Sequence, residues 1–280
     1  MGENDTNIRV SVDGPAGIIT LDRPDKLNAI TYRMIAGIQS AVDSLAQNPA
    51  VTGIVITGTG RGFCAGLDMG DLGRTASGET ESRSRPTDPD DLPALFGYLL
   101  RVPKPVIAAV NGTTAGGGFV LAMMCDLRFA VQSARFTTAF SKRGLIAEHG
   151  TSWLLPRLVG TGRALELLWS SKVIDAAEAY RIGFVDRVVE EGEGAALNEA
   201  VQFIRTLSET ASPRSMARMK ALVLRGWSQP IDVALHEVNE ELPAALAHPD
   251  ATEGVQSFLE KRPPNFAPLT GELQINIHSN

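Results

Sequence analysis

The sequence has little cysteine, no long hydrophobic run and no excess of basic charge. Two cysteines, Cys64 and Cys125, are too few for a disulfide framework or a four-cysteine zinc site, and they suit a reducing compartment. No stretch approaches the roughly 18 apolar residues of a membrane-spanning helix, and the polar start MGENDTNIRV has no apolar export segment. A formal net charge of -6 argues against a nucleic-acid partner that is held mainly by charge. We therefore predict a globular, cytoplasmic protein with no membrane and no nucleic-acid partner.

The order of the expected elements indicates an α/β fold. The length of 280 residues allows one large domain, or one domain with an appendage. Short buried-strand patterns alternate with Gly-rich loops and helical patterns, which is typical of α/β architecture. The patterns predict a hairpin over 8–12 and 18–21, helices over 31–45 and 119–125, and further strands over 53–57, 105–110, 127–131 and 135–140.

The two ends and one internal segment differ from this core. Residues 1–7 are polar and are expected to fray, whereas 70–91 is polar and of mixed charge, so it is either a solvated loop or a mobile lid. From about residue 160 the pattern becomes helical. We predict a core over 8–190 and a helical oligomerisation region over 191–280. Expected helix starts include Thr31 as an N-cap, capping boxes at Asp175 and Asp250, and Ser212 before a proline.

Two loops in which a strand runs into glycines, GFCAGLDM (62–69) and NGTTAGGGF (111–119), are the main candidates for a functional site. Glycines allow backbone N–H groups to approach a ligand. The second loop also leads into the N-terminus of a helix, where N–H groups point towards a bound anion. If the loops meet, their amides could form an oxyanion hole. Both loops could equally be tight turns between strands and helices, and the spacing alone does not decide between these interpretations.

Other chemical motifs are weaker. A dinucleotide fingerprint would need an apolar helix after Ala65, but the polar-rich LDMGDLG follows. The segment HEVNE has Glu240 where a zinc helix has its second histidine, and no G-x-S-x-G of a serine hydrolase occurs. Cys64 has no neighbour that would lower its pKa, so a small residue at a tight turn is the simpler interpretation.

Several segments together resemble the enoyl-CoA hydratase/isomerase (crotonase) family. They are LDRPDKLNAI (21–30), GIVITGTGRGFCAGLDM (53–69), KPVIAAVNGTTAGGGFVLAMMCDLRFA (104–130), LPRLVG (155–160) and FLEKRPP (258–264), in the family's order. The resemblance implies an α/β, crotonase-like spiral of ββα units with a C-terminal helical trimerisation region. It also implies a homotrimer, or a hexamer built as a dimer of trimers, that acts on acyl-CoA thioesters in fatty-acid or related metabolism. Coenzyme A would be part of the substrate, and no other cofactor or metal would be needed.

The resemblance also implies roles for particular residues. The main-chain N–H groups of Leu67 and Gly117 would form the oxyanion hole that holds the thioester oxygen of an enolate-like state. The remaining implied contacts are with the substrate: CoA would lie along Lys26, Leu27, Ala65, Gly66, Asp68 and Gly116, while Phe258 and Lys261 would reach the CoA of a neighbouring subunit.

The acid/base group is where the chain departs from the best-known hydratases of this family. Their two glutamates correspond here to Val120 and Phe140. Both residues are apolar and suggest an apolar channel for the acyl chain. Glu148 instead falls where monofunctional Δ3,Δ2-enoyl-CoA isomerases carry a single glutamate. Its apolar neighbours should raise its pKa by desolvation, towards the range useful for proton transfer near neutral pH. His149 is adjacent and could tune Glu148 or simply face solvent.

We therefore predict an enoyl-CoA hydratase or isomerase in which Glu148 is the single acid/base group. An isomerase-like proton shuttle is favoured over two-glutamate hydration. A non-catalytic acyl-CoA-binding paralogue and another crotonase chemistry, such as thioester hydrolysis, are the alternatives.

Overall fold

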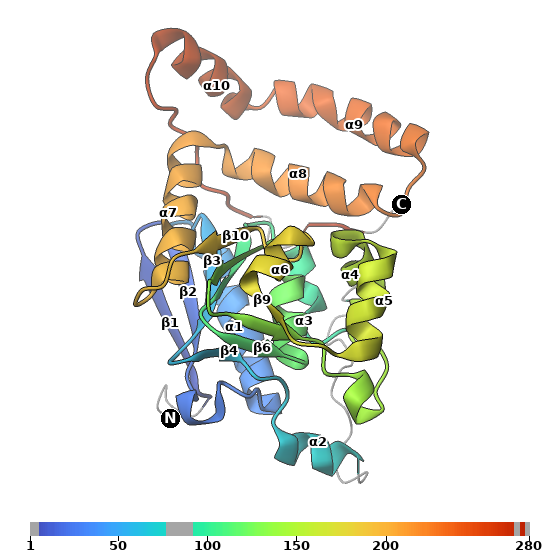
Figure 1. Ribbon diagram of the computed structural model, residues 1–280. Coiled ribbons are helices and arrows are strands. Elements are labelled where there is room, and N and C mark those ends of the chain that lie inside the picture. The colour runs from blue at the N-terminus through green and yellow to red at the C-terminus, as the bar shows by residue number, and fades with distance from the viewer. Residues whose placement is uncertain (1–5, 77–91, 272–274, 278–280) are drawn as a thin grey trace.

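Two sheets form the centre of the computed structural model, which describes residues 6–76, 92–271 and 275–277 (Figure 1). The larger sheet has the strand order β1-β2-β3-β5-β7-β10 and the smaller one β4-β6-β8-β9. The larger sheet comprises β1 (Ile8–Asp13), β2 (Ala16–Leu21), β3 (Gly53–Gly58), β5 (Val106–Val110), β7 (Leu127–Val131) and β10 (Arg187–Val189). The smaller comprises β4 (Gly62–Cys64), β6 (Thr113–Ala115), β8 (Arg135–Thr137) and β9 (Ile174–Asp175).

Apolar strands occupy the middle of the larger sheet. All five residues of β5 are buried, as are the first five of β3, which fits strands covered on both faces. The hairpin predicted at the N-terminus is confirmed, with β1 antiparallel to β2. From β2 onwards this sheet is parallel, and the parallel pairs β4–β6 and β6–β8 continue the pattern in the smaller sheet.

Helices cover the sheets where the sequence predicted them. Helix α1 (Tyr32–Gln47) follows Thr31, whose side-chain oxygen accepts a hydrogen bond from the Met34 amide at 3.2 Å. Helix α3 (Gly117–Met124) is buried from Gly118 onwards. The remaining helices of this part are α2 (Met69–Ala76), α4 (Thr151–Val159), α5 (Thr161–Ser170) and α6 (Ala176–Arg181), with 3-10 turns η1 (Pro24–Lys26), η2 (Gly97–Arg101) and η3 (Ser141–Arg143). The predicted loop 70–91 therefore begins as a helix, and its residues 77–91 lie outside the described part.

The C-terminal third is helical, as predicted. It contains α7 (Ala195–Thr210), α8 (Pro213–Gly226), α9 (Ile231–Leu246) and α10 (Pro249–Glu260). Helix α7 packs on β3, β5 and β7, whereas α9 and α10 stand off the sheets at the top of Figure 1. None of the described helices is long and apolar enough to cross a membrane.

One predicted helix start is wrong. The capping box assigned to Asp250 would begin the last helix after that residue, but α10 begins at Pro249 with His248 as its N-cap. The His248 ring nitrogen Nδ1 accepts from the Asp250 amide at 3.2 Å. The Asp250 carboxylate instead accepts a hydrogen bond from the Ser212 hydroxyl, which itself caps α8. A tertiary contact between two helix ends has therefore taken the side chain that the local pattern assigned to capping.

Candidate active site

A cavity of about 530 Å³ opens where the two Gly-rich loops meet. The strands β4 and β6 pair in parallel, so the residues after their carboxyl ends lie at one edge of the smaller sheet. Helix α3 starts at this edge, and the turn before α4 also contributes to the wall. The lining residues are Lys26, Ala29, Ala65–Gly70, Leu95, Gly116, Gly117, Thr138–Phe140, Arg143, Leu145, Glu148 and His149.

The backbone amides of Leu67 and Gly117 both border this cavity. A Cβ built on Gly117 would lie 3.4 Å from the Leu67 nitrogen, which places the two peptide groups side by side. Ile30 pairs with the groups on either side of Leu67: its amide donates to the Gly66 carbonyl, and its carbonyl accepts from Asp68. Within the described ranges, neither the Leu67 nor the Gly117 amide donates a backbone hydrogen bond. Two neighbouring N–H groups are therefore available to a ligand oxygen.

Glycine is required where the loops approach each other. Gly66 has a φ of +104°, and a Cβ there would lie 2.9 Å from the Ala115 carbonyl oxygen. At Gly118 a Cβ would lie 2.1 Å from the Cys64 carbonyl oxygen. No side chain fits at these distances, so the glycines of both loops are what allow the two amides to come together.

Glu148 reaches the cavity through a tight turn. His149 and Gly150 follow it with φ values of +52° and +76°, and α4 begins at the next residue. Left-handed backbone at a residue other than glycine costs on the order of 1–3 kcal/mol, so the surrounding fold holds His149 in place. The turn places both the Glu148 and the His149 side chain in the lining.

The electrostatic setting of Glu148 differs from that of the other lining carboxylate, Asp68. Desolvation by burial raises the pKa of Glu148 and lowers that of His149, whose Nε2 lies 3.5 Å from the Glu148 carboxylate. Burial opposes the ionisation of Asp68 too, but the Gly70 amide at 2.9 Å and the Arg23 guanidinium at 3.1 Å lower its pKa. The environment of Asp68 therefore keeps it ionised, whereas the environment of Glu148 favours its protonated, uncharged form.

Cys64 is not a nucleophile in this setting. It is fully buried, and desolvation raises the pKa of its thiol to about 12. Its sulfur accepts a hydrogen bond from the Gly66 amide at 3.4 Å. The side chain therefore contacts the backbone of the first Gly-rich loop, in agreement with its interpretation as a small residue at a tight turn.

Most of the site residues inferred from the sequence meet in this one cavity. Lys26, Ala65, Gly66, Leu67, Asp68, Gly116, Gly117, Phe140 and Glu148 all line it. Leu27 does not line it, but its carbonyl accepts from the Ala65 amide at 2.9 Å and so positions the loop. Val120 is fully buried in α3 and is likewise absent from the lining, so its apolar side chain belongs to the core. Phe258 lies on α10 and Lys261 at its end, in the C-terminal region.

Sequence reasoning missed Asn28, the residue that ties the segment after η1 to the first Gly-rich loop. Its side-chain oxygen accepts from the Arg23 amide at 2.8 Å, and its amide group donates to the carbonyls of Thr59 and Gly62 at 2.9 and 2.7 Å. Asn28 is fully buried and has a φ of +56°. A polar residue in the otherwise apolar LNAI was the available signal. Arg143, an exposed cation that lines the same cavity as Lys26, carried no signal.

Comparisons with known proteins agree with this geometry. The family model for enoyl-CoA hydratase/isomerase matches residues 14–268. A Mycobacterium tuberculosis protein named as a probable enoyl-CoA hydratase is 35% identical over 260 residues, covering 92% of this chain and 97% of its own. The 1,2-epoxyphenylacetyl-CoA isomerase of Escherichia coli is 34% identical over 248 residues, covering 89% and 93%.

A solved structure confirms the fold. The crystal structure of an enoyl-CoA hydratase subunit from Geobacillus kaustophilus superposes with a TM-score of 0.82 at 34% identity, covering 93% of this chain and 97% of that one. The chain therefore belongs to the enoyl-CoA hydratase/isomerase family, with the crotonase fold, and is an enzyme of that family.

Proposed function

We propose that the protein moves a proton along the acyl chain of an enoyl-CoA thioester, with Glu148 as the single acid/base group. The observation that carries this proposal is the contrast between the two carboxylates of the cavity. Asp68 is bound by Arg23 and stays ionised, whereas Glu148 is only partly exposed and the loss of hydration raises its pKa. Carboxylates whose environments push their pKa values apart mark the division of acid/base roles in many active sites.

The proposed reaction is the isomerisation of a 3-enoyl thioester to a 2-enoyl thioester. The Glu148 carboxylate takes a proton from C2, and the electron pair passes into the thioester carbonyl to give a dienolate. The amides of Leu67 and Gly117 donate to the oxygen as it gains charge, an interaction of the kind worth about 10²–10³ in rate per donor. Glu148 then returns the proton at C4, and the double bond forms between C2 and C3.

Hydration of a 2-enoyl thioester is less favoured by the residues present. It requires a positioned water, which the family's two-glutamate members hold between carboxylates. Phe140 lines the cavity at the position corresponding to the second glutamate, and its side chain cannot orient a water by hydrogen bonding. Thioester hydrolysis would meet the same need for a positioned water.

A pair of assays on the purified protein tests this proposal. A 3-enoyl-CoA and a 2-enoyl-CoA of equal chain length are supplied separately, and isomerisation and hydration are followed by mass spectrometry and absorbance. We expect isomerisation to exceed hydration in kcat/KM. Faster hydration would overturn the single-glutamate assignment, release of free CoA would indicate hydrolysis, and binding without turnover would indicate a non-catalytic paralogue.

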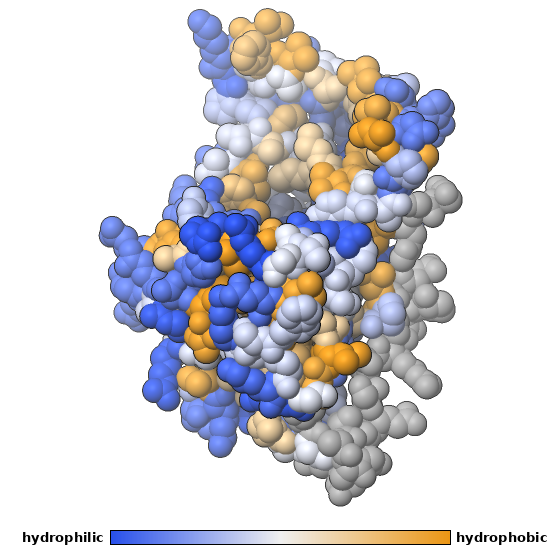
Figure 2. Space-filling view, turned by 45° about the vertical axis from the view of Figure 1, so that its right-hand side comes forward, coloured by the Kyte–Doolittle hydropathy of each residue, from blue (hydrophilic) through white to orange (hydrophobic). Residues whose placement is uncertain are grey.

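We also propose that CoA lies along Lys26 and Ala65 and that a second copy of the chain completes its binding. Helix α9 has no buried residue, although several of its side chains are large and apolar. Figure 2 shows hydrophobic residues on the outer C-terminal helices at the top of the molecule. The most exposed are Ile231, Leu246, Val255, Phe258 and Leu259. Apolar patches of this kind mark interaction sites, and a neighbouring Phe258 and Lys261 would reach the CoA from there.

Mass measurement in solution tests the assembly. We expect a trimer or a dimer of trimers for the native chain, and smaller species for Phe258→Asp. A monomeric native protein that binds CoA thioesters normally would contradict the shared site.

A further inference from the structure

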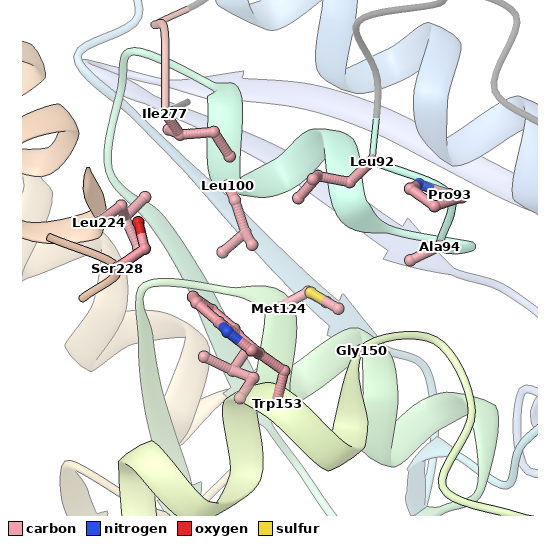
Figure 3. Close-up of a pocket in the computed structure, with 11 residues that line it drawn as sticks. Leu92, Pro93, Ala94, Leu100, Met124, Gly150, Trp153, Leu224, Ser228 and Ile277 are labelled. Carbon is pink, nitrogen blue, oxygen red and sulfur yellow. The ribbon is translucent and has the colours of Figure 1, made fainter. Parts of the chain in front are cut away.

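A second cavity, of about 380 Å³, lies beside the candidate active site and is lined mostly by apolar side chains (Figure 3). Its walls come from α3, η2, α4 and α8, from residues that adjoin η2, α4 and α8, and from the C-terminal tail. In Figure 3 the side chains of Ile277 and Leu100 lie above the open space, with Trp153 and Met124 below it. Leu92, Pro93, Ala94, Gly150, Leu154, Leu224 and Ser228 complete the lining. The one hydroxyl among them, that of Ser228, donates to the Arg225 carbonyl at 3.1 Å.

Two short segments of the chain contribute consecutive residues to the two cavities. Glu148 and His149 line the first cavity and the next residue, Gly150, lines the second. Likewise Leu95 faces the first and Ala94 the second. At both places two residues that follow each other in the chain line different cavities. One of these places directly follows Glu148, the candidate acid/base group. Gly150 has no side chain, and a Cβ there would meet the Met124 methyl group at 3.1 Å.

One lining residue of the second cavity, Ile277, lies outside the family match. The match ends at residue 268, and Ile277 lies nine positions beyond it. Two hydrogen bonds fix the tail to the body just before Ile277. The Ile275 amide donates to the Arg101 carbonyl at 2.8 Å, and Arg225 donates to the Asn276 carbonyl at 2.7 Å. Ile275 is itself buried against Ala217 and Ala221 of α8.

We propose that the second cavity is an acyl chamber that receives the apolar end of the substrate's acyl group, and that Ile277 limits the length it accepts. This inference rests on the function proposed above. The reacting carbons C1 to C4 lie at the Leu67 and Gly117 amides and at Glu148. The carbons beyond C4 pass the Gly150 and Ala94 wall into the chamber. The substrate class is then a medium-length, unfunctionalised acyl thioester, because a polar terminus would lose its hydration without gaining a partner.

Chain-length dependence gives the chamber a measurable signature. Burial of each methylene group is worth about fourfold in affinity at the usual transfer free energy. Extension from four to eight carbons places the added carbons in the chamber and should tighten binding by up to roughly 200-fold. Extension to twelve carbons should add little, because the Ile277 wall has been reached.

Calorimetric titration with saturated butanoyl-, octanoyl- and dodecanoyl-CoA tests this without relying on turnover. Ser228→Phe should fill the chamber from the side away from Glu148, weaken octanoyl-CoA binding at least tenfold and leave butanoyl-CoA within twofold. Ile277→Ala should act in the opposite sense and tighten dodecanoyl-CoA relative to octanoyl-CoA. Ser215→Phe, at an exposed position of α8, the helix that ends shortly before Ser228, is the matched control and should change none of the three.

The outcomes separate this inference from the proposed function. If the native chain bound none of the three thioesters, the proposed function itself would fail. If all three bound with equal Kd, or if Ser228→Phe weakened butanoyl- and octanoyl-CoA equally while its melting temperature stayed native, the chamber would be refuted. Because the Ile277→Ala effect is a gain, loss of folding cannot imitate it.

Discussion

Replacement of Glu148 by glutamine separates its chemical role from its structural one. Glutamine keeps the size of the side chain and one of its two oxygens, but an NH2 group replaces the other oxygen and the amide cannot take or return a proton. General acid/base groups contribute about 10²–10⁴ in rate, which corresponds to about 3–5 kcal/mol of the activation barrier. Since Glu148 would perform both proton transfers, we expect Glu148→Gln to lose at least a hundredfold in kcat/KM for a 3-enoyl-CoA.

The raised pKa of Glu148 also fixes the direction of the pH dependence. The folded protein retains this proton to higher pH than the unfolded chain, because burial disfavours the carboxylate. Its contribution to stability is therefore fully present below the unfolded value near 4.5 and is lost as the pH rises through the folded pKa. Glu148→Gln removes that loss, so at pH 7 the variant should be at least as stable as the native protein. The gain is small, because 36% of the side chain stays exposed to solvent.

Activity should follow pH in the opposite direction. The carboxylate form abstracts the proton, so kcat/KM should fall as the pH drops through the raised pKa of Glu148. Stopped assays across pH 5–8 and thermal unfolding over the same range measure both effects. Glu166→Gln serves as the control, since Glu166 is 58% exposed and pairs with Lys172 on the surface. A Glu148→Gln variant that kept half of its activity, or that melted well below the native protein at pH 7, would refute the reasoning.

Three further predictions concern the loops and the core. Gly66→Ala should lower kcat/KM about 10²–10³-fold, because its Cβ would displace the Leu67 amide from the shared position; Gly73→Ala, with nothing within 4 Å, should leave kcat/KM unchanged. Cys64 should react with a thiol reagent at pH 8 only on unfolding, since its pKa is raised to about 12; rapid labelling of the native protein would contradict this. Lys104→Met should lower the free energy of unfolding by about 1–3 kcal/mol in urea titrations, since the buried ammonium group donates to two carbonyls at the end of α1; an unchanged unfolding midpoint would show that these bonds contribute nothing.

Local signals in the sequence were sufficient for much of the fold. The first hairpin, the Thr31 cap of α1 and the Ser212 cap of α8 depend on residues within a few positions of each other, and the structure has all three. The Asp250 capping box failed although its local pattern was good. Ser212, 38 residues away, binds the carboxylate that the cap would have used.

The same distinction applies to the candidate site. The sequence by itself determined the two Gly-rich loops, because close backbone approach excludes a Cβ and so leaves a trace in residue type. It also determined the absence of glutamates at positions 120 and 140, which directed attention to Glu148. Tertiary structure alone decided that Val120 faces the core and that Phe140 faces the cavity. For Val120 the reason is that α3 is buried on all sides, so its sequence has no apolar periodicity that would indicate an inner face.

Tertiary structure also decided how Asn28 anchors the first loop and how the tail closes the second cavity. Asn28 bonds to residues more than 30 positions away, and Ile277 faces side chains from four separate segments of the chain. A cavity is the space left between such elements, and its walls share no sequence pattern. Residue type therefore encoded the candidate site, whereas the shape of the second cavity depends on how distant segments pack.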